Sequence, residues 1–153
     1  MADLKDRLRA DLTTALKARE ALTASTLRLV LTAITNAEVS GTEARELSDD
    51  EVLDIVAKEA KKRREAATAF DEGGRPELAQ KERDEARILA VYLPQQLTPE
   101  EIAAIVAGVV EQTGAAEQGG KAMGMVMGRV QPQVKGRADG GAVAAEVRRQ
   151  LGL

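Results

Sequence analysis

The segment YLPQQLTPEE, residues 92–101, divides the 153-residue chain into two helical parts. Pro94 disfavours the helical conformation in the residue before it, so a helix arriving from the N-terminal side should end near Leu93. Thr98, Pro99 and Glu101 form a helix start, with a capping hydroxyl, a proline in the first turn and a carboxylate three residues after the cap. We therefore expect a domain of residues 1–93, a linker of residues 94–98 and a domain of residues 99–153.

Upstream of this segment, apolar residues recur at intervals of three and four, which predicts four helices. The first has Asp3 as its expected cap, and the second spans about residues 22–39. The third opens with a capping box at Ser48 and Glu51 and runs to about residue 72, and the fourth begins at Pro76. One side of the first helix carries a regular series of leucines: Leu4, Leu8, Leu12 and Leu16.

Downstream, three shorter helices are expected. One follows Thr98 and ends before Gly114, a second covers residues 120–134 with a kink or an end near Pro132, and a third runs over about residues 140–151 with Asp139 as its cap. The sequence therefore predicts an all-α fold, with an N-terminal four-helix bundle-like domain followed by a small three-helix C-terminal domain.

The composition excludes several classes of catalytic site. The chain has no Cys and no His, so it lacks a thiol nucleophile, an imidazole base and the usual zinc ligands. We expect no catalytic residues, no metal site and no cofactor. No apolar run approaches the roughly 20 residues of a membrane-spanning helix, and the N-terminus interleaves charges with leucines, so we expect a cytoplasmic protein without membrane contact.

Charge is distributed unevenly along the chain. Residues 121–153 hold six basic and two acidic side chains, a net charge of +4, so the other residues carry −7 of the total of −3. A basic segment on an acidic body is typical of a surface for nucleic acid or another polyanion, and a solvated helix end is the alternative. A second basic run, residues 58–64, spreads around its helix. Acids at four-residue spacing can pair with it, Asp54 with Lys58 and Glu59 with Arg63, which favours a solvated face over an RNA contact.

The basic segment contains a row of glycines at four-residue spacing, Gly120, Gly124 and Gly128. Such a row permits the close approach of another helix or of a phosphate backbone, and we expect it to serve helix packing inside the C-terminal domain. Beyond it, Gly136 is predicted to adopt the left-handed conformation at a helix end, between the cations Lys135 and Arg137.

Two motifs resemble a known family: the YLP-x-QL segment at residues 92–97, and GRADG at residues 136–140. The chain resembles the GatB/YqeY (YqeY-like) family along essentially its whole length. Its C-terminal part is similar to the tail domain of the GatB protein of aspartyl/glutamyl-tRNA amidotransferase, which helps to hold the tRNA. This chain departs from that tail in having Arg137 in place of a lysine and Asp139 in place of an asparagine.

The resemblance implies a tRNA-associated, non-catalytic accessory domain, with tRNA and an amidotransferase or another translation-related protein as partners. By position, the RNA-binding candidates are Lys121, Arg129, Lys135, Gly136 and Arg137. Carbon–nitrogen ligation with glutamine as amide donor is implied by family transfer alone, as part of a complex. The alternative is a protein-interaction module that docks a partner helix on the face formed by the glycines and methionines of residues 120–128.

Overall fold

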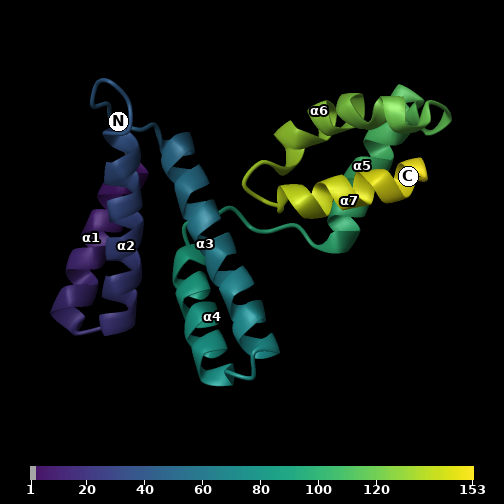
Figure 1. Cartoon of the computed structure of the whole chain (residues 1–153). Helices are drawn as coiled ribbons and strands as arrows, with labels where there is room; N and C mark the ends of the chain where they lie inside the picture. The colour runs from purple at the N-terminus through teal and green to yellow at the C-terminus, as the bar shows by residue number, and fades with distance from the viewer. Residues whose placement is uncertain (1–2) are drawn as a thin grey trace. The chain divides into compact units, whose positions relative to one another are not determined.

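The computed structural model describes residues 3–153, and every regular element in that range is helical (Figure 1). The chain forms two compact units, residues 1–93 and residues 94–153. The all-α prediction is confirmed. Residues 94–98, which we expected to be a linker, belong to the second unit.

The first unit contains the four expected helices, α1 (Asp3–Ala18), α2 (Ala21–Glu38), α3 (Asp49–Glu72) and α4 (Pro76–Ala90). Helices α1 and α2 form one hairpin and α3 and α4 form another, and α2 packs against both helices of the second hairpin (Figure 1). Their shared core is almost entirely aliphatic: Leu8, Leu27, Val30, Ile34, Leu47, Val52, Val56, Ala60, Leu89 and Tyr92.

One prediction for α1 is wrong, and its series of leucines is only partly buried. Asp3 already lies inside the helix, so it does not act as its cap. Leu16 is 50% exposed, although Leu8 is completely buried. The reason is that each step of four residues overshoots a helical turn by about 40°, so a leucine series at strict four-residue spacing rotates away from the core. Ala15, one residue earlier, takes the buried position.

The second unit contains α5 (Pro99–Thr113), two short 3₁₀ helices η1 (Ala115–Glu117) and η2 (Gly119–Ala122), α6 (Met123–Val134) and α7 (Gly140–Leu151). The three α-helices all pack on one another. Their core is built mainly from valines: Ile102, Val106, Val109, Ala115, Ala122, Val126, Val130, Val134, Val143, Val147 and Leu151. The sixth helix therefore starts at residue 123, later than expected, and it continues for two residues beyond Pro132.

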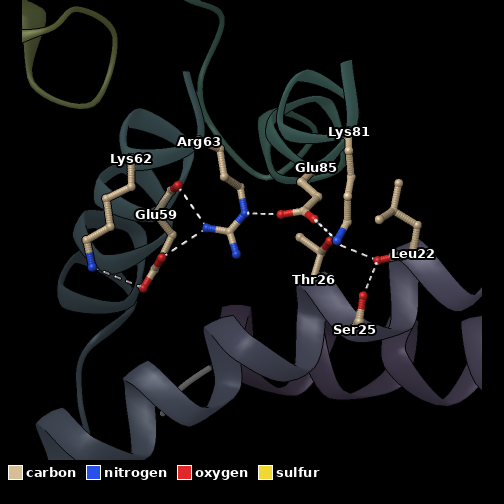
Figure 2. Close-up of polar contacts among 8 residues, drawn as sticks. All are labelled: Leu22, Ser25, Thr26, Glu59, Lys62, Arg63, Lys81 and Glu85. Atoms are coloured by element: carbon tan, nitrogen blue, oxygen red, sulfur yellow. Dashed lines mark hydrogen bonds and ion pairs between the residues drawn. The ribbon is translucent and has the colours of Figure 1, made fainter. Parts of the chain in front are cut away.

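A buried ionic network joins α3 to α4 (Figure 2). The Arg63 guanidinium donates from Nε to Glu85 Oε2 at 3.0 Å and from Nη1 to Glu59 Oε2 at 3.0 Å. Arg63 is only 6% exposed and Glu85 only 9%. The expected Glu59–Arg63 pair is thus confirmed, whereas no Asp54–Lys58 pair forms within residues 3–153.

The tyrosine of the YLP motif anchors the end of α4 to α1. The Tyr92 hydroxyl donates a hydrogen bond to Asp11 Oδ2 at 2.5 Å, and the Arg7 guanidinium lies 4.7 Å from the centre of the Tyr92 ring. Burial of the phenol and the adjacent Asp11 carboxylate raise the pKa of Tyr92, so the hydroxyl stays protonated as a hydrogen-bond donor.

We predict that Arg63→Ala lowers the free energy of unfolding by about 3–5 kcal/mol, because it leaves the buried Glu85 carboxylate without its guanidinium. Urea denaturation followed by circular dichroism measures this. Arg64→Ala is the matched control, since this neighbouring side chain is exposed and makes no ion pair within residues 3–153. It should change stability by at most about 0.5 kcal/mol. Equal effects of the two substitutions would contradict a stabilising role of the network.

The start of α3 predicts a pH dependence of stability. Hydrogen bonds from the Arg45 guanidinium, and from the Ser48 N–H of the confirmed capping box, lower the pKa of Glu51 from 4.5 to about 2. The stabilisation is therefore complete above the unfolded-state pKa and is lost as the pH falls from about 4.5 towards 2.

Glu51→Gln keeps a capping side chain but removes this titration, because an amide does not ionise. The difference in urea midpoint between the native protein and Glu51→Gln should shrink as the pH is lowered to about 2. Glu43→Gln is the control, because it removes an exposed carboxylate in the loop before α3 that makes no ion pair in the described chain. If both variants shift the midpoint in parallel at every pH, the Glu51 interpretation is wrong.

Candidate nucleic-acid interface

Charge in the second unit is segregated between its helices. Residues 94–120, which include α5 and η1, carry four acids and no Lys or Arg: Glu100, Glu101, Glu111 and Glu117. Residues 121–153 hold all six cations of the unit. A polyanion therefore meets its favourable charge on α6, α7 and the turn between them.

Helix α6 has one buried side and one open side. Val126, Val130 and Val134 are buried against the core. The α6 face, as we name it, consists of exposed residues at four-residue intervals: Lys121, which lies in η2 just before the helix, and Met125 and Arg129 on α6. A glycine precedes each of the latter two, Gly124 and Gly128. Met125 is 37% exposed. The face thus places two cations, Lys121 and Arg129, around a strip formed by Gly124, Met125 and Gly128. This strip, which we call the glycine strip, is apolar, and only Met125 in it has a side chain.

Within residues 3–153, the structure shows no close packing on Gly124 or Gly128. A Cβ atom at Gly124 or Gly128 would meet nothing within 4 Å among the neighbouring described residues. At Gly120 the nearest atom would be Leu153 Cδ2 at 3.7 Å, an ordinary contact. Packing inside the unit therefore does not offset the cost of about 1 kcal/mol that each glycine brings to a helix. The strip is open, and its backbone is accessible from outside.

The turn that follows α6 is held by hydrogen bonds from the segment that precedes α5. The Leu97 N–H donates to Arg137 O at 2.7 Å, and Gln96 Nε2 donates to Gly136 O at 3.0 Å. Gly136 has a φ of 75°, so its predicted left-handed conformation is confirmed. The YLP-x-QL and GRADG motifs therefore contact each other, and they fix the backbone on which Lys135 is exposed.

Arg137 differs from the other candidate cations. Its Nε donates to Gln95 O at 3.2 Å, and the residue is partly buried. Part of its guanidinium is therefore committed to holding the turn. The side chains of Lys121, Arg129 and Lys135 make no hydrogen bond or ion pair within residues 3–153, so their charges remain available.

The sequence prediction missed Arg148, a fourth exposed cation without a partner among the described residues. It lies in the last turn of α7, whose C-terminal end contacts η2 and brings Leu153 beside Gly120. The Arg148-Arg149 pair was the available signal. Its neighbour Arg149 is paired with Glu146, with 2.5 Å between Arg149 Nη2 and Glu146 Oε1. Hydrogen bonds from Arg149 and from Gln150 lower the pKa of Glu146 to about 2.

Asp139 takes the expected cap position of α7, with extended backbone angles, but its side chain makes no capping hydrogen bond. Its carboxylate lies beside Gly141, where Oδ2 would be 3.2 Å from an added Cβ. A carboxylate next to the basic turn disfavours a phosphate at this point. The N-terminus of α7 is therefore a poorer anion site than the α6 face.

Two other kinds of site are absent from the described part of the chain. Residues 3–153 contain no group of three or more acidic side chains placed to hold a metal ion. None of the described helices combines the length and the apolar character required to cross a membrane.

The comparison with known families is consistent with this architecture. A family model described as "Yqey-like protein" matches residues 5–151. No curated protein matches the sequence. The narrower resemblance of the C-terminal part to an amidotransferase tail stays a prediction. The family match spans both helical units, and the chain therefore belongs to the YqeY-like protein family.

Proposed function

We propose that this protein binds tRNA through the α6 face and the adjoining turn, as a non-catalytic accessory protein. One observation carries the proposal: Lys121, Arg129 and Lys135 are exposed cations without partners in residues 3–153, beside a glycine strip that nothing in the unit covers. The acids of the unit lie mainly on other elements. This arrangement suits a chain of phosphates, which needs positive charge and close access to a smooth surface.

The expected contacts are to phosphate rather than to bases. Residues 94–153 contain no Phe, Tyr or Trp, so this unit has no aromatic ring on which a base could stack. Lysines bind phosphate as point charges, and Arg129 offers a planar donor pair. Phosphate contacts position an RNA without reading its sequence. Recognition of a particular tRNA would then come from its shape or from a partner protein.

We propose an amidotransferase or another translation-related protein as that partner, following the resemblance to the GatB tail domain. A ligase activity with glutamine as amide donor would belong to such a complex, because this chain has no Cys and no His. Conversion of Glu-tRNA by the isolated chain, followed with labelled glutamine, would contradict the accessory role.

The triple variant Lys121→Ala, Arg129→Ala, Lys135→Ala should bind tRNA more weakly and with a smaller salt dependence. Each lost phosphate contact removes roughly 0.7–0.9 from the slope of log K against log salt, so the slope should fall by about 2–3. Fluorescence anisotropy with labelled bulk tRNA, in a salt series from about 50 to 200 mM, measures both quantities.

The matched control removes the same charge from the first unit, with Lys17→Ala, Arg28→Ala and Arg75→Ala. These three cations are exposed and make no ion pair within residues 3–153. The control should retain the native slope. Native-like binding by the α6-face triple variant, or equal losses in both triple variants, would rule out the proposed interface.

The openness of the glycine strip favours a second candidate, a partner helix docked on Gly124, Gly128 and Met125. Gly124→Leu with Gly128→Leu should block that approach, while better helix formers at both positions preserve the fold. If a partner helix docks there, capture of a partner protein from lysate should persist after nuclease treatment and be lost with this double variant. Capture that disappears with nuclease alone supports the RNA interface instead.

A further inference from the structure

A cleft of about 280 Å³ opens in the first unit, between the end of α4 and the α1–α2 hairpin. Ala15, Ile88 and Val91 form its apolar wall, and Thr14, Glu20 and Thr23 lie along the hairpin side. A second cleft of about 250 Å³ shares Ala15 and Glu20 and includes Leu16. Glu20 therefore stands between two adjoining hollows.

Apolar side chains at this site are unusually exposed. Val91 is 65% exposed and Leu16 is 50% exposed. Single exposed apolar residues are common on protein surfaces. Here Val91 flanks one hollow and Leu16 the other, and Glu20 lines both. The volume of either hollow accommodates one or two side chains rather than a second domain. The site therefore fits a short apolar segment.

The charged residues that line the 280 Å³ cleft are Asp11 and Glu20. Within residues 3–153 the Glu20 carboxylate makes no ion pair, and it does not cap α2. The last turn of α4 adds the partial negative charge of a helix C-terminus, since α4 ends at Ala90. The residues that line the 280 Å³ cleft include no Lys or Arg, and Arg19 lines the neighbouring hollow. Asp11 is already engaged by the Tyr92 hydroxyl and by Arg7, whose guanidinium also lies over the Tyr92 ring. Glu20 is therefore the acid at the cleft that is left to pair with a ligand.

The backbone of the hairpin holds Glu20 in place. Arg19 has a φ of 59°, a left-handed conformation that is strained for a residue other than glycine. This conformation lets the Glu20 N–H donate to Ala15 O at 2.9 Å, which closes the end of α1. The backbone that carries the carboxylate is thus fixed before binding, so only the rotamers of the Glu20 side chain remain to be ordered.

We propose that this cleft docks a short segment of a partner protein that presents an arginine or lysine beside an apolar side chain. The apolar side chain covers Val91 and Ile88, and the cation pairs with Glu20. The same carboxylate disfavours a phosphate or another anion at this point. The cleft therefore serves a partner different in kind from the polyanion proposed for the α6 face, and the two proposals are independent.

The test uses two synthetic peptides with the same apolar residues, acetyl-Ala-Arg-Leu-Leu-Arg-Ala-amide and acetyl-Ala-Glu-Leu-Leu-Glu-Ala-amide. Each is titrated into the full ¹⁵N-labelled chain and followed by amide chemical shifts. The basic peptide should shift the signals of Thr14, Glu20, Thr23 and Val91, and the acidic peptide should leave them unchanged. No response to the basic peptide at millimolar concentration, or equal responses to both peptides, would overturn the proposal.

Two exposed-site variants test the assigned contacts. Glu20→Gln should lower the affinity for the basic peptide by about fivefold, the effect of losing one partly exposed ion pair. Val91→Ser should also lower this affinity. The matched controls are Glu77→Gln, an exposed acid in the first turn of α4, and Leu29→Ser, which is 57% exposed on α2. Undiminished binding by both cleft variants, or equal losses in the controls, would show general charge attraction and overturn the assignment.

Discussion

The Arg63 guanidinium is the point on which the first unit depends (Figure 2). A core of Leu, Val, Ile and Ala is smooth, and such cores tolerate small slips of one helix along another. Arg63 restricts the sliding of α3 along α4, because its guanidinium donates to Glu85 on α4 from Nε while Nη1 donates to Glu59 on α3. Desolvating these charges is costly, so the network contributes mainly to the specificity of the register. The favoured arrangement is the one in which both carboxylates are satisfied.

In the second unit, hydrogen bonds to backbone carbonyl groups position the elements relative to one another. Its core is as aliphatic as the first, and no buried ion pair joins its described helices. Instead, the segment before α5 is fastened to the turn after α6 through Leu97 and Gln96. This fastening determines where Lys135 and Arg137 stand relative to α6. The binding surface that we propose is therefore positioned by a motif 40 residues upstream of it, from Gln96 to Gly136.

The features that the sequence predicted are local ones. Ser48 and Glu51 are three residues apart, so their capping box follows from helix geometry alone, and the left-handed Gly136 follows from the absence of a Cβ. The Glu59–Arg63 pair was predictable for the same reason. The contact of Arg63 with Glu85 was not, because it spans 22 residues and depends on how α3 and α4 align.

The site shows the same limit in a more instructive way. Four-residue spacing correctly placed Gly124 and Gly128 in one row, but it could not tell whether that row faced the core or the solvent. The valines decide the question, because Val126 and Val130 bury the opposite side of α6. Leu16 is a similar case, because the angular offset of the leucine series from the core grows with each step of four residues along α1.

The two proposed surfaces have opposite charge, and this has a physical consequence for how the protein would work. The α6 face attracts a polyanion over a range set by the Debye length, about 8 Å at physiological ionic strength. The cleft beside Glu20 is proposed to bind a basic segment instead. A basic protein segment and an RNA normally bind each other, so a chain with both surfaces can hold each on its own unit. Two proposed surfaces of opposite charge on one chain therefore favour an adaptor over a simple RNA-binding domain.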